Sequence, residues 1–155
     1  SVFQSKLTKY FEHEKDCGCD MDGLGTLFSL HNKHLNTWNT SDAASAVKRH
    51  YFDNPDYVKY NLNYFYKIAT YCRRHKINLI LITTPTWKAY YEHLNKRQLN
   101  EMYHLVQTAC SMYGLTYCNY LKDSRFSEQD FYDSDHLSDV GAIKFSKILS
   151  QDFHL

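Results

Sequence analysis

The sequence holds little of what marks disordered or membrane-spanning chains. Its 155 residues include only 5 glycines and 2 prolines, and no apolar run approaches the roughly 18 residues that a transmembrane helix needs. Hydrophobic residues make up 43% of the chain and charged residues 23%, as in ordinary folded domains. The composition therefore predicts a single compact domain over residues 1–155 and no membrane span.

An excess of charge of either sign is also missing. The 18 Lys and Arg residues are opposed by 17 Asp and Glu residues, so the formal net charge is +1. This balance provides no positive field that would wrap nucleic acid or attract an anionic membrane surface. We expect no nucleic-acid partner, and the sequence leaves the oligomeric state open.

The cysteines do not form a paired framework. They are five in number, and only Cys17 and Cys19 lie close together. Cys72 and Cys110 fall on apolar helical faces and Cys118 falls in a short apolar strand, which predicts buried free thiols and a reducing, cytoplasmic setting. A zinc site built on the first pair and nearby histidines is the weaker alternative, because structural zinc sites use a second tight pair; we expect no metal.

Aromatic residues are abundant, with 14 tyrosines and 9 phenylalanines. Because no basic stripe accompanies them, an aromatic core is a better interpretation than a surface that stacks bases or sugars. A core rich in tyrosine requires hydrogen-bond partners for its hydroxyl groups.

Hydrophobic periodicity predicts several helices. Residues 2–13 have the spacing of one amphipathic helix, and an irregular loop over residues 14–39 follows. Ser41 or Asp42 can cap a short helix rich in alanine. The next helix is expected to begin after Asn54, because a cap residue is followed there by a proline at the first helical position.

Two strands alternate with the later helices. Residues 77–84 are apolar and β-rich, which predicts a strand buried on both faces that ends at Pro85. A helical stretch from about residue 87, broken near Asn95, ends at Gly114. A second strand over residues 115–120 precedes a single turn at residues 127–131 and a final helix capped by Ser138. This order predicts a three-layer, flavodoxin-like α/β domain with a parallel sheet, and the few strands indicate that the sheet is incomplete.

The segment after the second strand carries the chemistry. Asp133 and His136 are three residues apart, so one tight turn can bring the carboxylate against the imidazole. Such a carboxylate orients the ring and stabilises the imidazolium that forms when the ring takes a proton from a hydroxyl group. From the residues alone, a helix cap built from Asp135 and Ser138, with the histidine on the surface, is a slightly better interpretation.

A family resemblance shifts this balance. The Asp133-x-x-His136 block, followed by Leu137 and by Gly141-Ala142, resembles the closing block of the SGNH (GDSL-type) hydrolase superfamily, in its bacterial SGNH-like members. The strand that ends at Pro85 also resembles the central strand of these enzymes, as do the helix before it and the strand over residues 115–120. The likeness covers roughly residues 54–150. It implies an SGNH-type fold, no cofactor, and a Ser-His-Asp triad in which His136 is the general base and Asp133 its orienting partner.

The nucleophile of that triad is missing. The family places it in a Gly-Asp-Ser turn near the start of the domain, and this chain contains no Gly-Asp-Ser. We favour the interpretation that these residues are the C-terminal portion of an esterase or acyl hydrolase whose serine lies upstream of Ser1. A degenerate, non-catalytic relative that acts as an interaction domain is the alternative, and an O-acyltransferase of the same fold is a third.

The expected substrate is a small ester or an acylated carbohydrate. Thr84, Trp87 and Tyr90 follow the first strand and are candidates for the walls of its pocket. Packing at the junction between strand and helix is the better interpretation of these three side chains.

Overall fold

The computed structural model describes residues 28–29, 40–52 and 54–154. Within them the elements follow in the order α2 (Thr40–His50), α3 (Pro55–Arg74), β1 (Ile80–Thr83), α4 (Lys88–His93), α5 (Lys96–Tyr113), β2 (Thr116–Asn119), the 3-10 helix η2 (Glu128–Asp130) and α6 (Asp139–Phe153). The helix expected over residues 2–13, and all but two residues of the loop expected over residues 14–39, lie outside the described residues.

The helix boundaries follow from the capping residues. The side chain of Asn54 accepts a hydrogen bond from the Asp56 N–H at 3.0 Å, and Pro55 occupies the first position of α3, as expected. The predicted break near Asn95 is confirmed, because this side chain caps α5. Gly114 ends that helix in the left-handed conformation, with φ 68°.

The start of α2 differs from the expectation. The helix begins at Thr40, so Ser41 and Asp42 lie inside its first turn rather than before it. Several capping residues follow one another here, and the sequence alone does not distinguish among them.

The sheet is parallel, as predicted, but small. β1 pairs with β2 in a register that sets Ile80 opposite Thr116 and Thr83 opposite Asn119. The prediction that the first strand is buried on both faces is wrong, since Ile82 is 40% exposed. Within the described residues β1 has one neighbouring strand, so no strand covers its other edge.

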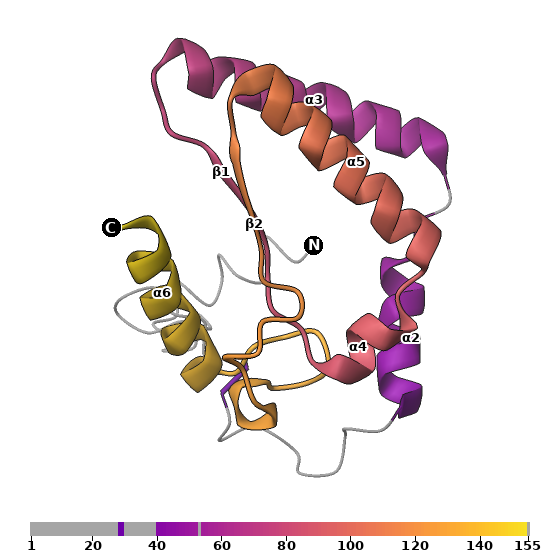
Figure 1. Ribbon diagram of the computed structural model, residues 1–155. Coiled ribbons are helices and arrows are strands. Elements are labelled where there is room, and N and C mark those ends of the chain that lie inside the picture. Colours follow the sequence, from indigo (N-terminus) through magenta and orange to yellow (C-terminus); the bar gives the residue numbers. More distant parts are fainter. Residues whose placement is uncertain (1–27, 30–39, 53, 155) are drawn as a thin grey trace, which may run out of the picture.

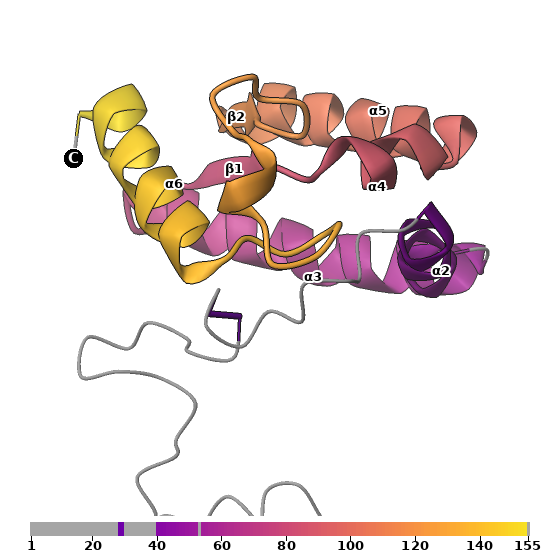
Figure 2. The ribbon, with the colours of Figure 1, turned by 90° about the horizontal axis from the view of Figure 1, so that it is seen from below.

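The helices lie on two sides of this sheet. In Figure 1 the strands lie between α6 and the pair formed by α3 and α5, and Figure 2 shows α3 running past both strands. The molecule is therefore a mixed α/β structure built on a two-stranded parallel sheet. No helix in the described ranges combines the length and the apolar character that a bilayer span requires.

A buried hydrophobic cluster connects the end of β2 to α6. Tyr120, Phe145 and Ile148 form a buried cluster, with Phe126 and Leu137 packed against it. The Tyr120 hydroxyl donates a hydrogen bond to Asp152 at 3.0 Å. Burial, reinforced by this carboxylate, raises the pKa of Tyr120 to about 12.

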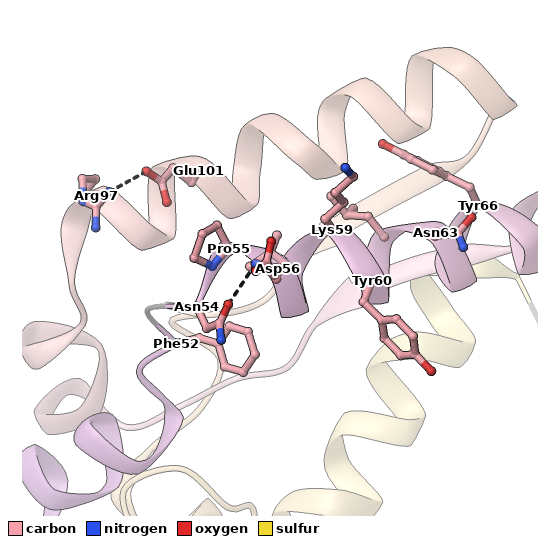
Figure 3. A pocket seen from close by; sticks show the side chains of 12 residues that line it. Phe52, Asn54, Pro55, Asp56, Lys59, Tyr60, Asn63, Tyr66, Arg97 and Glu101 are labelled. Atoms are coloured by element: carbon pink, nitrogen blue, oxygen red, sulfur yellow. Dashed lines mark hydrogen bonds and ion pairs between the residues drawn. The ribbon is translucent and has the colours of Figure 1, made fainter.

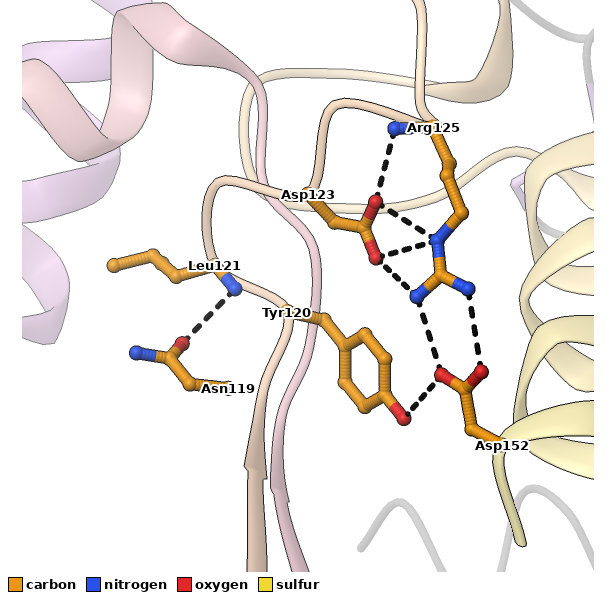
Figure 4. Close-up of polar contacts among 6 residues, drawn as sticks. All are labelled: Asn119, Tyr120, Leu121, Asp123, Arg125 and Asp152. Carbon is orange, nitrogen blue, oxygen red and sulfur yellow. Dashed lines mark hydrogen bonds and ion pairs between the residues drawn. The ribbon is translucent and has the colours of Figure 1, made fainter.

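Arg125, on the surface, also connects the loop after β2 to α6. Its guanidinium donates hydrogen bonds to Asp123, at 2.6 Å for the shortest, and to Asp152 at 3.2 Å (Figure 4). These bonds hold the pKa of both carboxyl groups below their usual range. The loop after β2 is thereby attached to the last turn of α6.

Two predictions about burial hold only in part. Tyr90 and Tyr120 are buried with hydroxyl partners, but a row of tyrosines on α3 is exposed, so the aromatic excess is not confined to the core. Cys72 is a buried free thiol as expected, whereas Cys110 and Cys118 are free but only half-buried. A structure of this size has too small a core to bury all of its tyrosines and cysteines.

Candidate active site

A closed loop presents the Asp-x-x-His block. Phe131 and Leu137 form an antiparallel bridge, and the Tyr132 N–H donates to the His136 carbonyl at 2.9 Å, so the loop folds back on itself. The Trp87 N–H donates to the Ser134 carbonyl at 3.0 Å. This bond joins the loop to the segment that follows β1, and it places the block beyond the carboxyl end of that strand, where open α/β sheets bind ligands.

The carboxylate of Asp133 accepts hydrogen bonds both from the backbone of its own loop and from the imidazole of His136. Its Oδ1 accepts hydrogen bonds from the backbone N–H groups of His136 at 2.7 Å and Asp135 at 3.1 Å. Nδ1 of the His136 ring lies 2.9 Å from Oδ1 and 3.0 Å from Oδ2 of the same carboxylate. The predicted contact between these two side chains is confirmed. Because an ionised carboxylate can only accept hydrogen bonds, Nδ1 carries the ring proton and donates to Asp133.

The other ring nitrogen, Nε2, has no hydrogen-bond partner among the residues that the structure describes. The His136 side chain is 43% exposed. The Phe28 ring stacks on the imidazole, with centroids 4.5 Å apart and planes within 9° of parallel. Among the described residues, the ring is thus held at Nδ1 by Asp133 and on one face by Phe28.

Asp135 has a different role from the helix cap that the sequence suggested. Its side chain is only 7% exposed, and Ser134 Oγ donates to its Oδ1 at 3.2 Å. Its Oδ2 lies 3.7 Å from Nδ1 of His136 and 3.8 Å from Nδ1 of His50. The capping part of the same prediction holds for Ser138 alone, whose hydroxyl oxygen accepts from the Gly141 N–H at 3.1 Å.

His50 is the neighbour that sequence reasoning missed. It is the last residue of α2, and its Nδ1 lies 2.8 Å from the Tyr90 hydroxyl. Burial raises the pKa of Tyr90, and the negative charge of Asp135 adds to this effect. Nothing local in the sequence connects α2 to the loop near residue 135, so no pattern could have revealed the contact.

The three residues expected to wall a pocket are dispersed. Tyr90 is buried and, with His50, lines a cavity of about 160 Å³ between α2, α4 and α5. Trp87 is half-buried, with its ring 5.8 Å from that of Phe131, and Thr84 is exposed. Trp87 and Tyr90 therefore border the loop, while their role toward a substrate stays a prediction.

Larger hollows lie away from the loop. One of about 900 Å³ opens between α3 and the start of α5, and its charged pair is Arg97 with Glu101, 3.1 Å apart (Figure 3). Another of about 560 Å³ borders the Arg125 cluster. Neither Asp133 nor His136 lines these two hollows, so they contribute nothing to the dyad.

Comparison with protein-family models, with curated proteins and with solved structures finds no match for this chain. The resemblance to the SGNH superfamily rests on the residues of the sequence alone.

Proposed function

We propose that the chain carries the Asp-His half of the Ser-His-Asp triad of an SGNH-type esterase or acyl hydrolase. The observation that supports this most is the bond between Asp133 and Nδ1 of His136, which leaves Nε2 without a described partner. Its position beyond the carboxyl end of β1 is where such a fold would hold its site.

The proposed chemistry uses His136 as the base. Nε2 takes the proton of a serine hydroxyl as that oxygen attacks the ester carbonyl, and it later protonates the departing alcohol. Asp133 stabilises the imidazolium through the Nδ1 proton. Water then attacks the acyl-serine as Nε2 takes one of its protons, and Nε2 returns this proton to the serine oxygen as the acid is released.

The serine is proposed to come from sequence outside these 155 residues. Two serines close to the histidine already make other hydrogen bonds: Ser134 Oγ donates to Asp135, and Ser138 Oγ caps α6. An oxyanion hole would come from the same outside part of the chain. The substrate class is a small ester or an acylated carbohydrate, and no cofactor enters the scheme.

A second candidate function is a non-catalytic interaction domain. It is favoured by a row of exposed large side chains along α3, namely Tyr57, Tyr60, Tyr64, Ile68 and Tyr71. Large apolar surfaces of this kind mark interaction sites in many proteins.

A fluorophosphonate label separates the two candidates. We expect no label on the 155-residue chain, and one label on the longer chain that includes the upstream sequence. His136→Ala in the longer chain should abolish labelling and hydrolysis of a short acyl ester, whereas the control His93→Ala, at the exposed last residue of α4, should retain both. A longer chain that keeps its hydrolysis rate after His136→Ala would refute the assignment.

A further inference from the structure

The Asp-x-x-His loop brings three metal-ligating side chains together. Asp133, Asp135 and His136 each offer one ligand atom, and these atoms all lie within 4.8 Å of one another. The hydrogen bonds of the Asp133–His136 dyad use two of the three groups, and Asp135 makes no hydrogen bond to the ring. The hydrogen bonds of the dyad therefore do not explain the buried, unsatisfied Oδ2 of Asp135.

Asp135 provides the independent observation. Its side chain is 93% buried, and its Oδ2 receives no hydrogen bond from any residue that the structure describes. A buried carboxylate oxygen without a donor is costly, because it has lost its water and gained nothing in exchange. This oxygen points to the imidazoles of His136 and His50, at 3.7 Å and 3.8 Å, beyond hydrogen-bonding distance of either ring.

The separation of 3.7 Å between Asp135 and His136 is too long for a hydrogen bond, whereas Asp133 and His136 are hydrogen-bonded directly at 2.9 Å. Ligands at about 2.0–2.2 Å from a tetrahedral zinc ion lie about 3.3–3.6 Å from one another. The Asp133–His136 contact of 2.9 Å and the Asp135–His136 separation of 3.7 Å lie on either side of this range. An ion between the three groups would satisfy the orphan oxygen.

The ligand set indicates the class of ion. Two carboxylates and one imidazole suit divalent ions of the zinc, cobalt and nickel group. Calcium takes oxygen ligands, so a set that includes the imidazole of His136 does not suit it.

We propose that Asp133, Asp135 and His136 bind a divalent transition-metal ion of the zinc class. This inference goes beyond the proposed hydrolase function and does not depend on it. Coordination by Nδ1 requires the lone pair of that nitrogen, so the ring proton moves to Nε2. A metal-bound His136 therefore cannot accept a proton at Nε2, and metal binding and action as a base exclude each other.

Calorimetric titration with zinc chloride tests the site in the 155-residue chain. The background is the double variant Cys17→Ser/Cys19→Ser, which removes the two adjacent thiols that would compete for zinc. We expect one equivalent to bind. Asp135→Asn keeps the side-chain shape and should weaken binding by more than the roughly 10- to 100-fold that follows loss of an outer-shell partner. His93→Ala, in which a histidine bonded to the Ala89 carbonyl is removed, is the matched control and should bind as before.

A second measurement does not depend on variants. Nitrogen-15 spectra of His136 in the same background should change from the Nδ1–H form to the Nε2–H form when one equivalent of zinc is added. Circular dichroism verifies that Asp135→Asn is folded. Unchanged affinity in that variant, zinc binding without a change of the His136 tautomer, or no binding at all would each overturn the proposal. Because neither readout involves hydrolysis, failure here is distinct from failure of the hydrolase assignment.

Discussion

Asp133 determines the geometry of the candidate site through a single carboxylate. Two backbone N–H groups fix its Oδ1, and the imidazole of His136 meets both oxygens. A group held by its own backbone loses little further freedom when it orients a ring, which is how a precise site is formed on a short loop. The spacing of these two residues was visible in the sequence and predicted their contact.

Replacement of the Asp133 carboxylate should slow hydrolysis by changing which nitrogen of His136 carries the proton. In the longer chain, Asp133→Asn is expected to lower the rate of short acyl-ester hydrolysis by about 10⁴-fold, because an amide no longer selects the Nδ1–H form. Asp123→Asn breaks a carboxylate pair with Arg125 outside the site, and it serves as the control. A rate for Asp133→Asn within about tenfold of the unmodified protein would contradict the role.

Gly141 is required by a close approach of two backbones. A Cβ atom at this position would lie 1.8 Å from the carbonyl oxygen of Asp130, in backbone that cannot yield easily. We expect Gly141→Ala to lower the free energy of unfolding by about 3 kcal/mol or more, measured by urea denaturation. Gly114→Ala meets no atom within 4 Å and suffers only from its φ of 68°, so its cost should be about 1 kcal/mol. The reverse order of the two costs would refute this account.

At the scale of elements, local signals determined most boundaries. Asn54 before Pro55, Asn95 and Gly114 each act within one turn of the chain, and the helix ends they predicted are confirmed. The strand burial could not be predicted in the same way, because it depends on how many strands lie beside β1. The joint between η2 and α6 is likewise a contact between elements, in which Lys144 Nζ donates to Asp130 Oδ2 at 2.7 Å.

This joint gives stability a defined pH dependence. Burial of Asp130 raises its pKa, but hydrogen bonds from Lys144 and from Ser127 outweigh burial and lower the pKa below its usual value. A carboxyl group with a lowered folded-state pKa stabilises the fold above its unfolded pKa, about 3.9, and this stability is lost as the pH falls through the folded value. Asp130→Asn should therefore cost about 2 kcal/mol at neutral pH and progressively less below about pH 4.

Urea denaturation at several pH values measures this difference. Glu128→Gln, an exposed residue of the same 3-10 helix, is the control and should change stability by less than about 0.5 kcal/mol. A cost of Asp130→Asn that is the same at pH 3 and pH 7 would exclude the ionised pair as its cause.

Across the whole molecule, stability should be uneven. The β2–α6 side has large buried side chains, including Tyr120 and Phe145, whereas the buried residues of α2 are the small Ala43 and Ala46. Burial of apolar area sets most of the stabilisation, so α2 gains less from its packing. The contact of His50 with the Asp135 loop belongs to this scale, and the sequence could not predict it because the two residues come from separate elements.

Native-state hydrogen exchange measures this unevenness. After correction for intrinsic rates, amides in the middle of α2 should exchange roughly tenfold or more faster than those of β2 and α6, a difference of about 1.4 kcal/mol in opening free energy. Equal protection in α2 and α6 would show that the molecule opens as one unit.

The central claim is that Asp133 holds His136 by Nδ1 and leaves Nε2 as a base. Nitrogen-15 NMR of the histidine ring in the metal-free 155-residue chain, at a pH where the ring is neutral, tests it most directly. The account predicts the Nδ1–H form for His136 and loss of this preference in Asp133→Asn, whereas the ring of His75, the C-cap of α3, should not change. A proton on Nε2 of His136 in the unmodified chain would contradict the account.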